Sequence, residues 1–131
     1  MKNIIETVIS HQDLKIFLQA VMETDLYDIL AGDGPYTIFA PTDTAFRKLP
    51  LNTIEKLFQD KEQLTEILTR HIVLFKIKST DLEINKKIQT ANGKKISLKN
   101  HDKYIIESAT IIKKDIICEN GIIHTINEVL L

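Results

Sequence analysis

The stretch Tyr36–Pro50, YTIFAPTDTAFRKLP, gathers hydroxyl and carboxylate side chains around a proline, as the wall of an active site would. With His71, Asp43 would form a pair of general base and orienting carboxylate, and a threonine would be the nucleophile. Threonine is a poor nucleophile without an N-terminal amine. The chain also lacks a Gly-x-Ser-x-Gly elbow, a phosphate loop and a dinucleotide fingerprint. We therefore predict that the protein is not an enzyme and has no catalytic residue.

Metal binding would depend on His71, His101, His124 and Glu119, but these residues show neither His-x-x-x-His nor His-x-His spacing. The single cysteine, Cys118, excludes an internal disulfide and a cysteine-based metal cluster, and we expect it to be a small buried residue. His124 lies in the apolar stretch GIIHTI, which is typical of a hydrogen-bonded core histidine. We predict no metal and no cofactor.

The net charge of −1 is distributed unevenly along the chain. Lys76–Lys103 contains eight lysines and three acidic residues, so it is the candidate surface for an acidic partner. The competing interpretation is that these lysines solvate strand faces and sheet edges. Because the stretch lacks arginine, the usual reader of phosphates and bases, we predict no nucleic-acid partner. The candidate binding residues are Arg70, His71, Lys86, Lys87, Lys94 and Lys95.

The first half of the chain has the spacing of helices. Apolar residues recur at helical intervals over residues 3–10 and 14–24, and a further turn precedes Gly32. Ser10 or Asp13 is the expected cap of the second helix. The stretch YTIFA predicts a short buried strand, after which Thr42 is the expected N-cap of a helix with Asp43 in its first turn. Residues 51–75 are expected to continue helically after Pro50.

The second half of the chain, after residue 74, favours strands. Asn92-Gly93 and Asn120-Gly121 each lie between β-branched runs, which is the strongest short signal for a hairpin turn. The order of elements, helices first and an antiparallel sheet afterwards, predicts an α+β fold. The length of 131 residues predicts one domain, residues 1–131.

His71 lies among Leu64, Ile67 and Leu68 in the helical pattern, so its imidazole is expected on an apolar face. A half-buried imidazole must be hydrogen-bonded, because a buried polar group without a partner costs roughly 1–3 kcal/mol. Our hypothesis is that His71, Thr37 and Asp43 form one internal network that ties the helix to the sheet.

Three segments of the chain together resemble the fasciclin-type domain, also called the periostin-type repeat. They are Tyr36–Pro50, Ile67–Val73 (ILTRHIV) and Asn120–Leu131 (NGIIHTINEVLL), and they follow the order and spacing of the family's motifs across nearly the whole chain. The residues that match the family signature are Thr37, Phe39, Pro41, Thr42, Asp43, Phe46, His71, Asn120, Gly121 and His124.

The chain departs from the family pattern at two positions. Arg70 stands where the family usually has a tyrosine before the histidine, so the integrin-dependent adhesion associated with that tyrosine-histidine pair in animal members is not carried over to Arg70 and His71. Asn127 stands where the family usually has aspartate, which removes a charge but keeps a hydrogen-bonding side chain.

The resemblance implies a β-wedge of two antiparallel sheets with the helical N-terminal half packed alongside. It also implies a secreted, cell-surface or periplasmic adhesion module that binds a protein or a surface polysaccharide. The sequence does not give the oligomeric state, and we favour a monomer. A peripheral membrane or cell-wall association would then require a leader or anchor outside this chain. Two alternatives stay open: a small apolar-ligand binder that uses a cleft in the wedge, and a cytoplasmic regulator.

Overall fold

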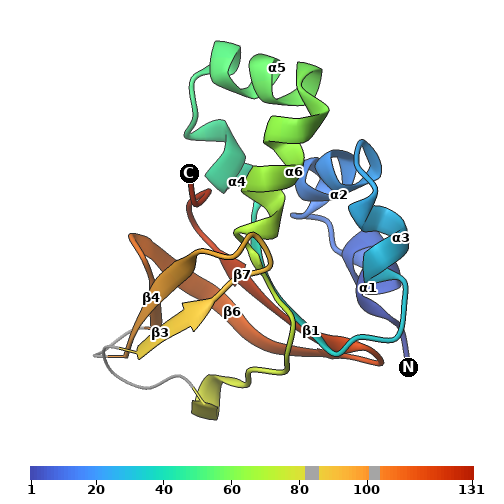
Figure 1. Cartoon of the computed structure of the whole chain (residues 1–131), viewed down its shortest axis with the longest axis vertical. Coiled ribbons are helices and arrows are strands. Elements are labelled where there is room, and N and C mark those ends of the chain that lie inside the picture. Colours follow the sequence, from blue (N-terminus) through green and yellow to red (C-terminus); the bar gives the residue numbers. More distant parts are fainter. Residues whose placement is uncertain (82–85, 101–103) are drawn as a thin grey trace.

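The structure, a computed structural model, describes residues 1–81, 86–100 and 104–131, with the side chain of Asn100 left out. It confirms the α+β class (Figure 1). The helices are α1 (Ile4–Ser10), α2 (Lys15–Met22), α3 (Leu26–Leu30), α4 (Asp43–Arg47), α5 (Leu51–Gln59) and α6 (Lys61–Thr69), with a 3₁₀ turn at Ser79–Asp81. The strands are β1 (Tyr36–Pro41), β2 (Ile72–Val73), β3 (Lys86–Gln89), β4 (Lys95–Asn100), β5 (Tyr104–Ile106), β6 (Ala109–Cys118) and β7 (Gly121–Ile126).

The strands pair in the order β2-β1-β7-β6-β5-β4-β3, and the long strand β6 joins the two halves of the wedge. Neighbouring strands are antiparallel except β1 and β7, which run parallel from Tyr36 opposite Gly121 to Pro41 opposite Ile126. The expectation of a wholly antiparallel arrangement was therefore wrong at this pair. The physical reason is that parallel neighbours need a long connection, and local sequence patterns do not reveal which distant strands meet.

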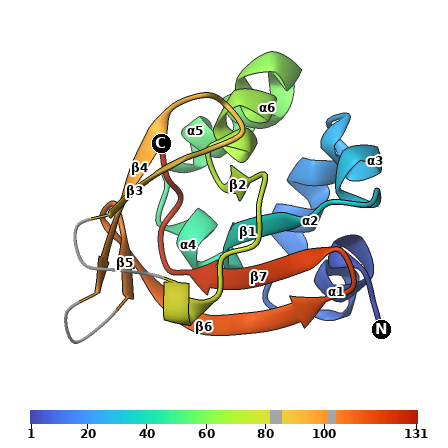
Figure 2. The same cartoon turned by 60° about the horizontal axis from the view of Figure 1, so that its bottom comes forward.

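Two clusters of buried apolar side chains lie on the faces of the sheet. One cluster packs the helices against the sheet and includes Ile4, Phe17 and Leu68. The other fills the inside of the wedge and includes Phe39 and Ile126. All six residues of β7 are buried, since β7 lies between β1 and β6 (Figure 2).

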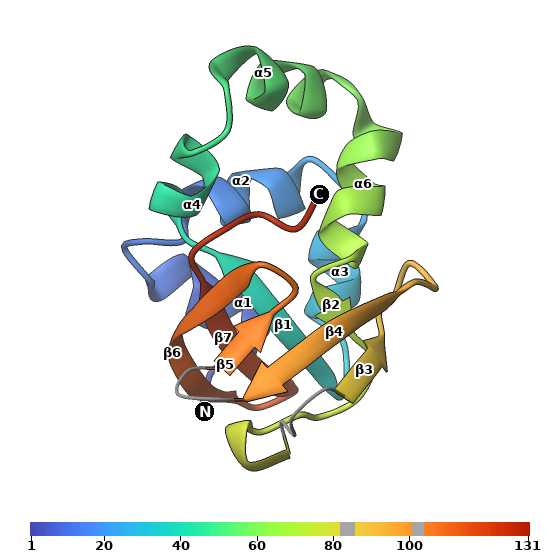
Figure 3. The ribbon, with the colours of Figure 1, turned by 90° about the vertical axis from the view of Figure 1, so that its left-hand side faces the viewer.

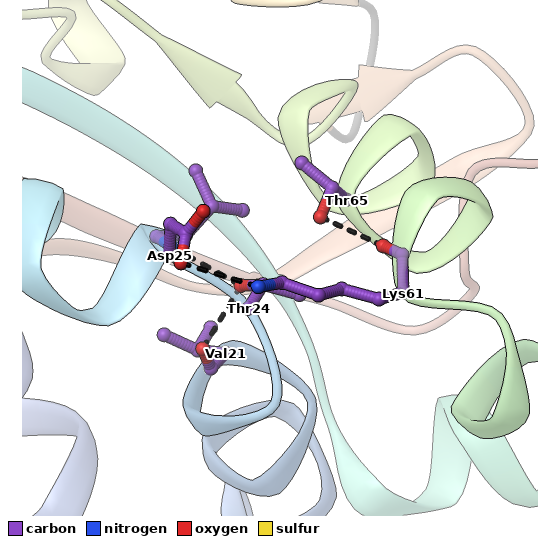
Figure 4. Close-up of polar contacts among 6 residues, drawn as sticks. Val21, Thr24, Asp25, Lys61 and Thr65 are labelled. Carbon is purple, nitrogen blue, oxygen red and sulfur yellow. Dashed lines mark hydrogen bonds and ion pairs between the residues drawn. The ribbon is translucent and has the colours of Figure 1, made fainter.

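The corner between α2 and α3 lies beside the start of α6 (Figure 4). Thr24 donates a hydrogen bond from its hydroxyl to the Val21 carbonyl (2.9 Å), and Lys61 Nζ lies 3.3 Å from Asp25 Oδ1. Thr65 donates to the Lys61 carbonyl within α6 (2.8 Å). Because the Lys61–Asp25 pair is exposed to solvent, it contributes only about 0–1 kcal/mol, and apolar packing holds this corner.

The helix expected over residues 51–75 is interrupted at Asp60 and ends at Thr69, so this expectation was wrong in its extent. Asp60 ends α5 and caps α6, where its carboxylate accepts from the Gln63 amide (3.1 Å). The next residues become extended because Ile72 and Val73 pair with β1. At the start of α4, Thr42 is the N-cap as expected and accepts from the Ala45 amide (3.2 Å).

The turns between strands follow the sequence signals with one difference. Gly93 has a φ of 87°, as the Asn92-Gly93 turn between β3 and β4 requires. In the second hairpin, Cys118 pairs with Gly121, so the turn is centred one residue earlier than expected. Gly121 is required there because β1 leaves no room for a side chain: a Cβ would lie 2.1 Å from the Tyr36 carbonyl oxygen.

Candidate functional site

The β3–β4 hairpin presents a row of lysines to solvent. Ile88 pairs with Ile96, and both are buried on the inner face of the wedge. Successive side chains of a strand alternate between faces, so the residues between them point outward. Lys87, Lys95 and Lys99 are the cations of this outer face, and all three are exposed. We call these three residues the lysine face.

The other lysine candidates lie around the lysine face. Lys86 is exposed at the start of β3 and pairs with Leu98, so strand alternation places it with the inner row of residues. Lys94 is exposed in the hairpin turn. The candidate stretch also includes Lys103, which lies outside the described residues, as does His101.

A groove of about 410 Å³ brings together three of the candidate residues, Arg70, Lys94 and Lys95. We call it the basic groove. Arg70 ends α6, and the two lysines come from the β3–β4 hairpin. The remaining lining residues are Ile96, Glu107, Ser108, Val129, Leu130 and Leu131. Glu107 is the acidic residue of the lining, and its Oε1 accepts a hydrogen bond from the Ser97 amide (3.2 Å).

His71 is fully buried and does not reach the surface beside Arg70. Its Nδ1 lies 2.8 Å from the Ile67 carbonyl, and its Nε2 accepts from the Leu130 amide (2.9 Å). These partners require the neutral tautomer with the proton on Nδ1. Burial lowers the pKa of His71 to about 4, which outweighs the opposing effect of the Ile67 carbonyl. His71 therefore anchors the C-terminal segment that lines the basic groove.

The expected network of His71 with Thr37 and Asp43 was wrong, because each side chain has different partners. Thr37 donates to the Phe75 carbonyl (2.6 Å) and accepts from the Ile77 amide (2.8 Å). Asp43 Oδ1 accepts from the Ile16 amide (2.8 Å) in the first turn of α2. Asp43 thus caps a helix distant in sequence, in place of the expected cap Ser10 or Asp13.

Asn120 ties three parts of the fold together. Its Oδ1 accepts from the Ile4 amide at the start of α1 (2.8 Å). Its Nδ2 donates to the carbonyls of Leu30 (2.8 Å) and Gly32 (2.7 Å) at the end of α3. Because both N–H groups and the oxygen of the side-chain amide are hydrogen-bonded to the main chain and Asn120 is buried, its role is structural.

His124 is buried in β7 and stacks on Phe39, with ring centroids 5.6 Å apart. Its Nδ1 accepts from the Asp115 amide (3.1 Å), and its Nε2 lies 2.8 Å from the Ile77 carbonyl. Burial lowers the pKa of His124, although the Ile77 carbonyl and the Asp115 carboxylate favour its charged form. The ring is therefore neutral and structural, as the apolar stretch indicated.

Sequence reasoning missed Asp115 and Ser79, which lie next to His124. Asp115 has a φ of 57°, and its carboxylate accepts from both the amide and the hydroxyl of Ser79. Desolvation opposes ionisation of Asp115, but the Ser79 hydrogen bonds outweigh it and lower its pKa. An aspartate inside a β-branched strand was the available signal, since Asp tolerates the left-handed region.

These groups do not form a catalytic triad. The Ser79 hydroxyl donates to Asp115, while both ring nitrogens of His124 face main-chain groups. His124 therefore does not contact the Ser79 hydroxyl, as the histidine of a serine triad would. Within the described residues, no three His, Cys, Asp or Glu side chains gather as a metal site would need. The remaining signature residues, Pro41 at the end of β1 and Phe46 in α4, are buried.

None of the helices in the described part of the chain combines the length and the apolar character that a membrane span needs. The lysine face and the basic groove present cationic side chains at the surface. Both are suited to bind carboxylate or sulfate groups through charge-assisted hydrogen bonds.

Comparisons with known proteins relate the chain to proteins of several kinds of organism. It is 40% identical over its full length to an uncharacterized protein of Synechocystis, sll1735, and covers 98% of that protein. It is 32% identical to human periostin over 93% of the chain, which spans 15% of periostin. It is also 32% identical to the cell surface glycolipoprotein MPB83 of Mycobacterium bovis, over 83% of the chain and 49% of that protein.

A solved structure and a family model point to the same family as these relatives. A FAS1 domain pair from the insect cell adhesion molecule fasciclin I superposes with a TM-score of 0.84 at 21% identity, over 99% of this chain and 51% of that chain. The family model of the fasciclin domain matches residues 12–131. The chain therefore belongs to the fasciclin domain family.

Proposed function

We propose that this domain is a non-enzymatic interaction module that binds an acidic protein or polysaccharide partner at the lysine face. The observation that carries the proposal is the register of β3 and β4, which places Lys87, Lys95 and Lys99 on one exposed face. A row of cations at strand spacing matches a partner with repeated negative charges.

The relatives support a role outside the cell or at its surface. The names of two related proteins refer to a cell surface glycolipoprotein and a cell adhesion molecule. We accordingly propose that residues 1–131 act as one monomeric module, secreted or at the cell surface. A tether to a membrane or cell wall would come from a segment outside this chain.

The alternative function, an apolar-ligand binder with a cleft in the wedge, has less support from the packing. Ten buried apolar residues fill the inside of the wedge, from Phe39 on β1 to Leu130 near the end of the described chain. An apolar ligand would have to displace this packing, which costs about 1.5–3 kcal/mol for each large side chain moved into water.

The competing interpretation of the lysines is that they only protect an edge strand. β3 is the last strand in the order of pairing, and lysines at such an edge discourage pairing with other chains. The two interpretations differ in their consequences. Edge protection requires lysines on β3 alone, whereas binding also requires Lys95 and Lys99 on β4.

The test is retention on a heparin column and on a poly-glutamate column in a salt gradient. The triple variant Lys87→Glu, Lys95→Glu and Lys99→Glu is compared with a control in which Lys15, Lys56 and Lys61 on the helices are changed to Glu. We expect the first variant to lose retention and the control to keep most of it, although both have the same net charge. Equal retention of the two variants would overturn the proposal, because net charge alone would then govern binding.

A further inference from the structure

The β3–β4 hairpin extends towards β2 and the end of α6 (Figure 3). Its tip contacts β2 and is bordered by two hollows. The Ala91 amide donates to the Ile72 carbonyl (2.7 Å), which fixes the turn against β2. Segments 70–75 and 89–96 contribute lining residues to both hollows. Arg70 precedes Ile72 and lines the basic groove, whereas Leu74 follows Ile72 and lines the second hollow.

The second hollow has a volume of about 350 Å³ and is lined by Leu74, Phe75, Gln89, Thr90, Ala91 and Gly93. We call it the apolar hollow. Leu74 is 60% exposed and Phe75 is 48% exposed. Single exposed apolar residues are ordinary, but two large ones that line one hollow are a candidate contact surface.

The main chain keeps these two side chains at the surface. Thr37 donates to the Phe75 carbonyl and accepts from the Ile77 amide, so the backbone is fixed on both sides of Lys76. Val73 and Ile77 are buried on either side of the pair. The exposure of Leu74 and Phe75 is therefore set by well-bonded backbone.

The two hollows border the same hairpin turn, since Gly93 lines the apolar hollow and the next residue, Lys94, lines the basic groove. The lining of the basic groove includes three cationic side chains, Arg70, Lys94 and Lys95, and the acidic side chain of Glu107. A ligand that spans the turn would thus meet positive charge on one side and large apolar side chains on the other.

We propose that the hairpin tip is a docking site for an extended acidic peptide segment of a partner protein, with a large apolar side chain next to its carboxylates. This inference rests on the proposed function and names the partner class as protein. The carboxylates are complementary to Arg70 and Lys94, and the apolar side chain packs on Leu74 and Phe75. A sulfated polysaccharide would satisfy the cations but has no aliphatic side chain for the apolar hollow.

The experiment measures fluorescence anisotropy with a fluorescein-labelled peptide, Gly-Glu-Asp-Glu-Leu-Phe-Gly. Two further probes are the same peptide with Leu-Phe replaced by Ser-Ser and a fluorescein-labelled heparin oligosaccharide. Two double variants of the protein are compared. One combines Arg70→Gln with Lys94→Glu in the basic groove, and the other combines Leu74→Ser with Phe75→Ser in the apolar hollow. The matched controls are Lys56→Glu, an exposed helical lysine, and Met22→Ser, an apolar side chain that is 61% exposed. Urea unfolding of each variant confirms that it is folded.

We expect each double variant to weaken binding of the first peptide by roughly tenfold or more, with the controls within about twofold of the wild type. We expect the Ser-Ser peptide to bind the wild-type protein more weakly than the first peptide by a similar factor. Its affinity should not change when Leu74 and Phe75 are replaced. The inference is overturned if the two peptides bind equally. It is also overturned if the heparin oligosaccharide binds more tightly than the first peptide.

The failure of this inference is distinguishable from failure of the proposed function. The protein variants used with the peptide leave Lys87, Lys95 and Lys99 intact. Of the residues changed in the column experiment only Lys95 also lines the basic groove, and Arg70, Lys94, Leu74 and Phe75 stay unchanged there. If retention depends on the lysine face while the peptide result is negative, the proposed function stands and the partner class is wrong. If retention does not depend on it, the proposed function fails whatever the peptide does.

Discussion

Acid should destabilise the fold through the buried ring of His71. In the folded state the ring is neutral, because Nε2 accepts from the Leu130 amide and Nδ1 faces the Ile67 carbonyl. Its pKa is lowered by burial to about 4, whereas the ordinary value is 6.5. The unfolded chain therefore binds more protons between these values, so the contribution of His71 is complete above about pH 6.5 and is lost as the pH falls towards 4.

The magnitude follows from the two pKa values. Between about pH 7.5 and about pH 5, the linkage relation gives a loss of about 2 kcal/mol in the free energy of unfolding from His71 alone. The pKa of His124 is lowered by burial as well, so His124 adds a loss of the same sign. The free energy of unfolding of the wild-type protein should accordingly fall by more than the contribution of His71 alone.

The assay is urea unfolding of the wild type and of His71→Gln at both pH values. Glutamine does not titrate and replaces at most one of the two hydrogen bonds, so we expect a loss of roughly 1–3 kcal/mol at about pH 7.5. We then expect the fall on acidification to be about 2 kcal/mol smaller than in the wild type. Ile72→Val is the control, since it weakens the same region but keeps His71.

If acidification lowers the free energy of unfolding equally in the wild type and in His71→Gln, the assigned role of His71 is wrong. In that case the imidazole would not be the group that takes up protons on unfolding. If the free energy of unfolding of Ile72→Val also falls less on acidification than that of the wild type, lower stability, and not the loss of the imidazole, changes the pH dependence.

The remaining predictions concern the side chains that hold the frame of the site, and urea unfolding measures each of them. Asn120→Ala should cost roughly 2–4 kcal/mol, because it removes the partner of two buried main-chain groups and of one partly buried carbonyl, whereas Asn52→Ala at an exposed helix position should stay within about 0.5 kcal/mol. Gly121→Ala should prevent normal pairing of β1 with β7, while Gly93→Ala should cost only about 1 kcal/mol, since it has a positive φ but open space around it. Asp43→Ala should cost about 1 kcal/mol and Asp43→Asn less, because asparagine keeps the acceptor for α2. Equal effects within any of these pairs would contradict the assigned role.

Local sequence signals predicted the elements that depend on local chemistry. The Asn92-Gly93 turn and the Thr42 N-cap occur as expected, because each needs only a few neighbouring residues. The α+β class followed from the change of pattern after residue 74. Asn120 was identified as part of the Asn120-Gly121 turn and of the family signature, but its three main-chain partners were not foreseen.

The errors arose where a partner is distant in sequence. Asp43 was expected to serve its own helix, but its carboxylate reaches Ile16 on α2, 27 residues earlier. His71 was expected to meet Thr37 and Asp43, but the end of α6 turns it towards Leu130. A residue's side chain type states what it must bond to, while the tertiary fold decides which group supplies the bond.

The surface was only partly predictable for the same reason. The excess of lysine in Lys76–Lys103 was visible in the sequence, but the split between the lysine face and the basic groove depends on the register of β3 with β4. The place of Arg70 beside Lys94 depends on the hairpin folding back to α6 and β2. The apolar hollow at Leu74 was missed because these residues were expected in a helix.

The central claim is that the β3–β4 hairpin and the adjoining segment 70–75 are the binding surface. The most direct measurement is a titration of the ¹⁵N-labelled protein with the peptide Gly-Glu-Asp-Glu-Leu-Phe-Gly, followed by amide chemical shifts. We predict that the amide chemical shifts of residues 70–75 and 86–99 change saturably with peptide concentration, and that those of α1, α3 and α5 do not change. Shifts concentrated on the helices, or small shifts spread over all lysines without saturation, would contradict it.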